Sequence, residues 1–143
     1  MNNSQEKLKK IFNKNIIFGE NLSKYSWFNL GGPAEIFFRP NDLDQLVRFL
    51  KEYKNYIGKL TVIGAGSNTL IRDKGVKGTI LKLSSKFSYV KLINENTLEV
   101  GAATFDKKVS DFAADNSIGG FEFLSCIPGS IGGGITMNSG CYN

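Results

Sequence analysis

The chain contains no histidine, and its 143 residues include only two cysteines and three prolines. Without histidine, neither imidazole acid–base catalysis nor a histidine-ligated metal is possible within these residues. Cys126 and Cys141 lack the Cys-x-x-Cys spacing of metal or redox motifs, and two thiols do not indicate a disulfide framework. We therefore expect no metal site, and we interpret each cysteine as a small packed side chain.

Long apolar runs are also absent. No stretch has the length of a membrane span, and residues 1–15 are polar and lysine-rich, without the apolar segment of a signal peptide. We therefore expect a cytoplasmic protein with no membrane partner. The net charge is +5, but its lysines are scattered and no dense basic block alternates with aromatic residues, so we do not expect nucleic-acid binding. A positive field still suits ligands that carry phosphates.

The chain does contain sixteen glycines, and two groups of them mark candidate binding loops. Residues 64–68, Gly-Ala-Gly-Ser-Asn, follow the apolar run 60–63. A β-branched run that stops at two glycines predicts a buried strand ending in a tight turn. Glycine permits close approach of the backbone, so successive amides can bind a phosphate, with Ser67 and Asn68 as further donors.

Two common phosphate-binding loops are excluded by the residues around this turn. A Rossmann fingerprint would need a third glycine at Thr69 and a helix directly after it, whereas residues 70–75 lead into another turn. A P-loop needs Gly-Lys-Ser/Thr, and that tripeptide is absent. By itself, the turn is equally compatible with a structural role in which its glycines bind nothing.

The second glycine group, at residues 127–134, makes a ligand more plausible than a turn alone. Pro128 fixes its own φ and lacks an amide donor, whereas the glycines at 129 and 132–134 let the backbone pass close to a planar or charged group. One glycine group indicates a turn, but two predict a cleft. A dinucleotide is long enough to contact both groups, with its pyrophosphate at one and its ring or ribitol at the other.

Three spaced segments resemble the MurB family, the UDP-N-acetylenolpyruvoylglucosamine reductases of peptidoglycan precursor synthesis. They are residues 27–34 (Trp-Phe-Asn-Leu-Gly-Gly-Pro-Ala), 64–70 and 127–140, in the family's order. The resemblance runs from about residue 21 to the end of the chain. Ser139 stands where the family usually has alanine and Thr69 where leucine is common, and both changes are small in volume.

The resemblance implies an α+β fold of the vanillyl-alcohol-oxidase (PCMH) type, with non-covalent FAD between two small α+β subdomains. We assign residues 1–20 to an N-terminal helical extension and 21–143 to the FAD-binding domain, with subdomains at about 21–78 and 79–143. The residues implied to hold FAD are Gly64, Ala65, Gly66, Ser67, Asn68 and Thr69 at the pyrophosphate, and Gly129, Ser130, Gly132, Gly133 and Asn138 at the ribitol and isoalloxazine.

The implied reaction uses NADPH as hydride donor and the enolpyruvyl group of a UDP-sugar as acceptor. In the family, the catalytic serine, glutamate and arginine lie beyond the part matched here, so no residue of this chain is assigned a catalytic role. We expect the chain to be truncated, to lack the substrate-binding domain and to be inactive alone. Three alternatives stay open: a non-catalytic flavin-binding module, another flavin oxidase of this fold, and an interaction domain whose glycines serve only turns. The sequence does not indicate an oligomeric state.

Periodicity predicts several elements of the first subdomain. Apolar residues at 8, 11 and 12 predict a short amphipathic helix, residues 21–27 are expected to be extended, and residues 34–38 form a strand. Asn41 or Asp42 should cap the clearest helix, which leads to the strand at 60–63 in a βαβ-like unit. Its expected inner face consists of Leu43, Leu46, Val47 and Leu50.

For the second subdomain, the sequence predicts strands at residues 79–83, 87–93 and 97–100, in a second sheet that is at least partly antiparallel. Residues 94–96 should turn the last two into a hairpin. A helix through about Asp115 could be capped by Thr104. Its expected inner face consists of Phe105, Val109, Phe112 and Ala113.

Overall fold

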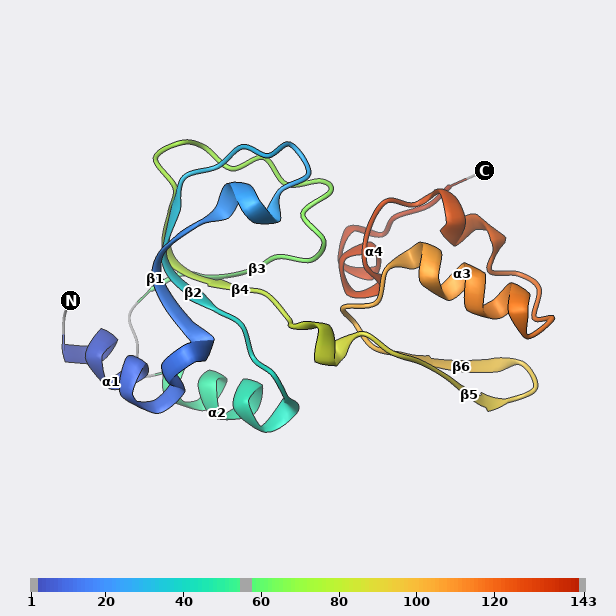
Figure 1. Ribbon diagram of the computed structural model, residues 1–143, viewed down its shortest axis with the longest axis horizontal. Coiled ribbons are helices and arrows are strands. Elements are labelled where there is room, and N and C mark those ends of the chain that lie inside the picture. Colours follow the sequence, from blue (N-terminus) through green and yellow to red (C-terminus); the bar gives the residue numbers. More distant parts are fainter. Residues whose placement is uncertain (1–2, 55–57, 142–143) are drawn as a thin grey trace.

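The computed structural model describes residues 3–54 and 58–141, which form two bodies joined by the chain that leaves β4 (Figure 1). The first body is a four-stranded sheet with two helices, and the second is a β-hairpin with two helices. The helices are α1 (Asn3–Phe12), α2 (Leu43–Tyr53), α3 (Asp106–Asp115) and α4 (Ile131–Met137). The strands are β1 (Ile16–Asn21), β2 (Pro33–Phe38), β3 (Leu60–Val62), β4 (Val76–Leu81), β5 (Val90–Asn94) and β6 (Thr97–Val100).

The sheet of the first body has the strand order β1-β2-β4-β3. Strand β1 runs antiparallel to β2, whereas β2 and β3 both run parallel to the central strand β4. Phe38 at the end of β2 and Val62 at the end of β3 both pair with Leu81 at the end of β4. The carboxyl ends of three parallel strands therefore meet at one edge of the sheet, where ligands commonly bind in such sheets.

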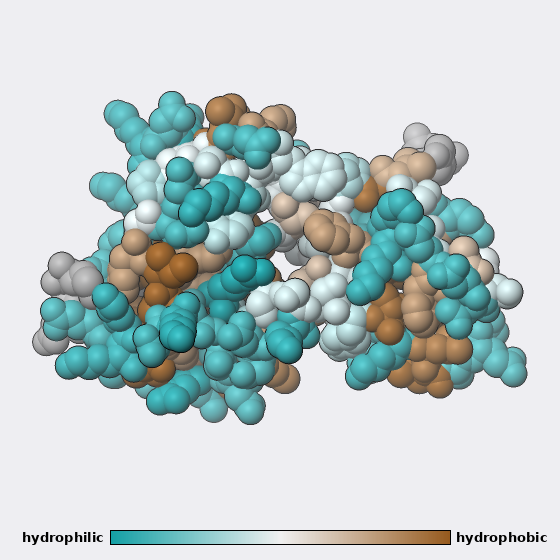
Figure 2. All heavy atoms as spheres, viewed as in Figure 1, coloured by the Kyte–Doolittle hydropathy of each residue, from teal (hydrophilic) through white to brown (hydrophobic). Residues whose placement is uncertain are grey.

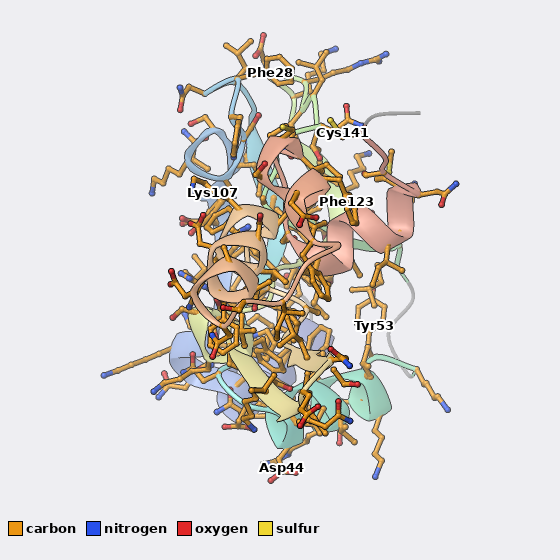
Figure 3. All side chains as sticks on the ribbon, turned by 90° about the vertical axis from the view of Figure 1, so that its right-hand side faces the viewer. Phe28, Asp44, Tyr53, Lys107, Phe123 and Cys141 are labelled. Atoms are coloured by element: carbon orange, nitrogen blue, oxygen red, sulfur yellow. The ribbon has the colours of Figure 1, made fainter. Side chains whose placement is uncertain are left out.

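Each face of this sheet carries its own hydrophobic cluster, because successive side chains of a strand point to opposite faces. On the helical face, Phe38 stacks on Phe49 of α2 with a centroid distance of 3.9 Å, and Phe12 of α1 meets both rings edge-on at 5.2 and 5.5 Å. On the other face, Phe37 packs with buried residues of the connecting loops, among them Leu22 and Ile71. Phe28, in the connection between β1 and β2, lies at the end of the molecule opposite Asp44 of α2 (Figure 3).

Three elements of the first body agree with the sequence, and one helical face does not. Helix α1 buries Leu8 and Phe12, β2 covers residues 34–38, and the Asp42 side chain caps α2 by accepting a 2.7 Å hydrogen bond from the Gln45 amide. Of the predicted inner face of α2, Leu46 packs against the core as expected, but Leu43, Val47 and Leu50 are exposed. Phe49, which was not predicted, is buried instead. The apolar spacing of α2 fits two adjacent faces of the helix, one with Leu43, Val47 and Leu50 and one with Phe49. Stacking of Phe49 against Phe38 determines that the second face is turned toward the core.

Two predictions for residues before β2 are wrong. Residues 16–20 were assigned to a helical extension but belong to strand β1, which pairs with β2. Residues 21–27 were expected to be extended, yet Leu22–Tyr25 form a 3-10 helix whose start is capped by the Asn21 side chain. Neither segment has a clear period of its own, so pairing with β2 and burial of Leu22 decide its conformation.

The division between subdomains also needs correction. Residues 79–83 were predicted to lie in the second sheet, but residues 79–81 belong to β4, the strand between β2 and β3. A boundary at 78/79 would therefore cut the first sheet, and the chain crosses to the second body only after Leu81. The predicted hairpin is confirmed, because β5 pairs antiparallel with β6 around residues 95–96. Its first strand was predicted from residue 87 but begins at Val90, since Ser85–Phe87 form a 3-10 helix.

Helix α3 begins without the predicted cap. The Thr104 hydroxyl instead donates to the carbonyl oxygen of Tyr89 and accepts from its amide, both at 3.0 Å, which ties the helix to the hairpin. Phe105 occupies the N-cap position and is exposed, so its predicted place on the inner face is wrong. Val109 and Ala113 are buried as expected. In the part of the chain that the structure describes, no helix has the length and apolar character needed to cross a membrane.

Candidate ligand-binding site

A cavity of about 820 Å³ lies between the two bodies, in a volume range typical of small-molecule sites (roughly 300–1,000 Å³). Figure 2 shows a gap between the two bodies, with atoms joining them above and below it. The carboxyl edge of the first sheet lines one side of the cavity, and the segment from Cys126 into α4 lines the other. A ligand in this cavity would touch both bodies at once.

The two glycine groups predicted to form a cleft do meet at this cavity. A Cβ built on Gly64 would lie 2.9 Å from Ser130 Oγ and 3.5 Å from Gly133 Cα. The cavity lining includes ten of the eleven candidate residues, namely Gly64, Ala65, Gly66, Ser67, Asn68, Thr69, Gly129, Ser130, Gly132 and Gly133. Asn138 is not in that lining, and it ends α4 in a left-handed conformation with φ 49° and ψ 48°. Its role stays a prediction.

The loop at residues 64–68 presents unused amide donors. Its shape is held by Gly66, whose φ is +77° and whose carbonyl oxygen accepts a 3.1 Å hydrogen bond from the Trp27 amide. Among the described residues, no protein group accepts a hydrogen bond from any amide of residues 64–68. Such a run of free amides on a concave turn is a favourable environment for an anion.

The second glycine group serves two purposes. Gly132 approaches other backbone, since its amide donates to the Ala102 carbonyl oxygen at 2.9 Å and a Cβ there would lie 3.0 Å from that oxygen. At Gly133 the nearest obstacle to a Cβ is the Ser130 hydroxyl at 3.3 Å, so this residue leaves space in the cavity. Gly132 therefore allows close packing against the backbone of Ala102, whereas Gly133 leaves space for a ligand in the cavity.

One wall residue that the sequence analysis missed is Asp106, the first residue of α3. Its side chain is 2% exposed, and within the described chain its Oδ2 atom has no hydrogen-bond partner. Burial raises the pKa of this carboxyl above its usual range. Oδ2 lies 2.8 Å from the position of a Cβ on Gly129, so this acceptor sits directly behind the second glycine group.

The raised pKa of Asp106 predicts how stability depends on pH. The folded state binds this proton more tightly than the unfolded state, so the contribution of Asp106 to stability is greatest in acid and is lost as the pH rises through its folded pKa. Asp106→Asn removes that loss and should unfold at higher urea concentration than wild type at neutral pH, by about 1 kcal/mol or more. Urea denaturation from acid to neutral pH measures it, with the exposed Asp115→Asn on the same helix as control. Parallel pH profiles for wild type and Asp106→Asn would contradict the expectation.

Two cations were also missed, Arg39 and Lys82, both on the cavity wall. Arg39 directly follows β2 and Lys82 directly follows β4. A cation directly after a predicted strand is the feature of the sequence that could have identified them as site residues. Lys82 Nζ donates to the Gly64 carbonyl oxygen and lies 5.9 Å from the centroid of the Tyr25 ring. Burial lowers the pKa of Lys82, and the nearby charge of Arg39 lowers it further.

Apolar side chains complete the lining. Val62, Phe105 and Met137 are all large, exposed and on the cavity wall. A planar ring bound against them would remove their apolar surface from water. Among residues 3–54 and 58–141, no group of three histidine, cysteine, aspartate or glutamate residues is placed to hold a metal ion.

An α+β fold in two bodies, with free amides and cations on one cavity wall and apolar side chains nearby, defines a dinucleotide-binding protein whose ligand carries a planar ring. Residues 34–143 match the family described as FAD binding domain, and this chain belongs to that family. The fit to FAD is physical, because the amides of 64–68 suit a pyrophosphate, the apolar wall suits an isoalloxazine, and the unpartnered Asp106 oxygen suits a hydroxyl or ring N–H donor.

Relatives place the chain more closely. It is 46% identical over 143 residues to the UDP-N-acetylenolpyruvoylglucosamine reductase of Pelagibacter ubique. That alignment covers 98% of this chain and 47% of the relative. The reductase of Rickettsia canadensis is 46% identical over 122 residues, 85% of this chain and 41% of the relative. The crystal structure of the reductase (MurB) from Thermus caldophilus matches with a TM-score of 0.67 at 28% identity, covering 88% of this chain and 42% of that one.

These likenesses confirm the predicted resemblance to MurB and the FAD-binding fold of two α+β parts. The chain spans less than half the length of the relatives it matches. The similarity therefore concerns the FAD-binding part of such a reductase.

Proposed function

We propose that this chain is the FAD-binding part of an NADPH-dependent UDP-N-acetylenolpyruvoylglucosamine reductase, which forms UDP-N-acetylmuramate for peptidoglycan in the cytoplasm. The observation that carries the proposal is the meeting of two glycine groups at one cavity, with Gly64 against Ser130 and Gly133. The names of relatives 46% identical to this chain support the choice of reaction.

In this proposal the protein supplies binding and orientation. The amides of residues 64–68, with the Ser67 and Asn68 side chains, would hold the pyrophosphate, and Thr69 would end that loop. The backbone from Gly129 to Gly133 would approach the ribitol and isoalloxazine, with Asn138 at the end of α4. When bound, the flavin would supply hydride transfer between NADPH and the enolpyruvyl group of the UDP-sugar.

The apolar wall and the buried carboxyl have separate tasks. Val62, Phe105 and Met137 would exclude water from one face of the ring, which strengthens polar interactions around it. Asp106 would accept a hydrogen bond from a ribityl hydroxyl or a ring N–H, which would satisfy its unpartnered oxygen. None of these residues is placed as a proton donor to substrate.

The test is flavin binding followed by turnover. The purified chain should be yellow and should quench FAD fluorescence saturably, yet show no UDP-sugar-dependent NADPH oxidation under anaerobic conditions. A positioned general acid typically contributes ~10²–10⁴-fold, and this site has none assigned. Gly133→Leu should weaken FAD binding about 10- to 100-fold by filling the cavity. Its control is Gly119→Leu, where the nearest obstacle to a Cβ is Glu122 Oε1 at 3.5 Å.

Each other outcome points to a different function. A colourless chain that binds no flavin would contradict the proposal and favour an interaction domain whose glycines serve turns. Alcohol oxidation in place of enolpyruvyl reduction would indicate another oxidase of the fold, and flavin binding without either activity in any longer form would indicate a binding module. Substrate-dependent NADPH oxidation by this chain would show that it contains the proton donor, and Asp106, Ser67 and Ser130 would be replaced first.

A further inference from the structure

We propose that Arg39 and Lys82 belong to a pyrophosphate site. The amides of residues 64–68 would donate hydrogen bonds to the pyrophosphate, and the two cations would neutralise its negative charge. The inference rests on the proposed function, because it names the residues that hold the charged part of the same dinucleotide. Neither cation belongs to the motifs that carry the family resemblance.

The sheet topology brings these groups together. Phe38 and Val62 both pair with Leu81, so β2, β3 and β4 end at the same level. The Lys82 amide donates to the Phe38 carbonyl oxygen at 3.0 Å, and the Ile63 amide donates to the Leu81 carbonyl oxygen at 2.9 Å. The carboxyl edge of the sheet therefore places Arg39, Lys82 and the loop that begins at Gly64 next to one another. This edge faces the side where the chain crosses to the second body (Figure 1).

Lys82 is held at the start of the glycine loop. Its Nζ donates to the Gly64 carbonyl oxygen and lies 5.9 Å from the centroid of the Tyr25 ring, whose hydroxyl donates to Glu20 at 3.0 Å. The side chain is half-buried, which limits the hydration of its ammonium group. An ammonium fixed at the first residue of a run of free amides adds a full charge to their partial charges.

Arg39 adds a second positive charge that is not neutralised by the protein. Its side chain is exposed on the cavity wall, close enough to Lys82 to lower the pKa of that ammonium group. In the described part of the chain, no ion pair involves either residue. Two neighbouring cations, one of them half-buried, repel each other, and a bound anion between them would turn that repulsion into attraction.

The opposite wall has the other polarity. Asp106, on the second body, presents a buried carboxyl beside Gly129, where a built Cβ would lie 2.8 Å from Asp106 Oδ2 and 3.9 Å from Ser67 Oγ of the facing loop. A phosphate would be repelled there once the carboxyl is ionised, whereas hydroxyl and ring N–H groups would find an acceptor. In this proposal Arg39 and Lys82 would bind the phosphates of the dinucleotide, and Asp106 would accept a hydrogen bond from a hydroxyl or ring N–H of the same ligand.

The experiment compares ligands with and without phosphate. In the 143-residue chain, the double variant Arg39→Gln/Lys82→Met should bind FAD about 100-fold more weakly than wild type, as expected for lost charge-assisted hydrogen bonds. Riboflavin, which has no phosphate, should bind both proteins equally. The control is Lys74→Gln/Lys77→Gln, which removes two exposed charges outside the cavity and should leave both affinities unchanged. Unchanged FAD affinity in the first variant, or equal weakening of FAD and riboflavin, would overturn the proposal.

A third probe separates this inference from the function on which it rests. If wild type binds no flavin at all, the proposed function fails, and titration with inorganic pyrophosphate then decides the anion site. Pyrophosphate binding to wild type that Arg39→Gln/Lys82→Met abolishes would support the site. Absence of pyrophosphate binding to wild type, or equal binding to both proteins, would overturn it.

Discussion

Phe49→Ala is expected to lower the free energy of unfolding by about 3–5 kcal/mol, the usual loss for a large aromatic side chain removed from a core. Phe49 is fully buried and stacks on Phe38 at 3.9 Å, with Phe12 at 5.5 Å and Tyr53 at 5.4 Å between ring centroids. The change would leave a cavity between α1, α2 and the sheet. Urea denaturation followed by circular dichroism measures the effect.

The neighbouring position on the same helix provides the control. Leu50 is 40% exposed, so Leu50→Ala should cost less than about 1 kcal/mol. The sequence pattern alone predicts the reverse order, since it assigns Leu50 to the inner face and omits Phe49. A larger loss for Leu50→Ala than for Phe49→Ala would therefore favour the face predicted from spacing over the observed one.

Gly66→Ala is expected to destabilise the chain by about 2–4 kcal/mol and to weaken FAD binding with it. Gly66 has a φ of +77°, which an alanine adopts only with strain, and its new Cβ would lie 1.9 Å from the Tyr25 carbonyl oxygen. That oxygen belongs to the backbone and cannot rotate away, so the loop itself must shift. The amides of residues 64–68 would then lose their alignment. Urea denaturation and FAD fluorescence titration on the same sample measure both effects.

Gly19→Ala is the control that separates backbone strain from the steric clash between the new Cβ and the Tyr25 carbonyl oxygen. Gly19 has a similar φ of +70°, but no heavy atom lies within 4 Å of the Cβ position, so the expected loss is about 1–2 kcal/mol with FAD affinity retained. Equal losses of stability in the two variants would show that conformation alone requires glycine at 66. Undiminished FAD affinity in a folded Gly66→Ala protein would remove the loop from the site.

The binding loops were predictable because their signals are local. A glycine that follows a β-branched strand, or a proline followed by spaced glycines, restricts the backbone through its immediate neighbours. The same holds for the Asp42 cap, strand β2 and the hairpin of β5 and β6, each of which the structure contains. Ten of the eleven candidate residues accordingly line the cavity, although their contacts with FAD remain a proposal.

The residues that were missed depend on partners distant in sequence. Arg39 and Lys82 are ordinary surface cations until β2 and β4 are known to be neighbours, and strand order is not encoded in the period of either strand. Asp106 fits the first turn of a helix, where an acid is common, and its burial becomes visible only when Gly129 is placed beside it. The assignment of β4 to the second sheet fails for the same reason.

The sequence by itself determined the class of ligand site, since its glycine loops, its lack of histidine and its three spaced motifs are properties of the chain read in order. It also determined the start of α2, where Asp42 is the cap, and the turn of the β5–β6 hairpin. Only the tertiary structure decided that residues 16–21 join the sheet, that Phe49 rather than Leu50 faces the core, and which side chains stand around the cavity. Those choices are made by packing and charge between segments that are separate in the sequence, and no local pattern records which segments will meet.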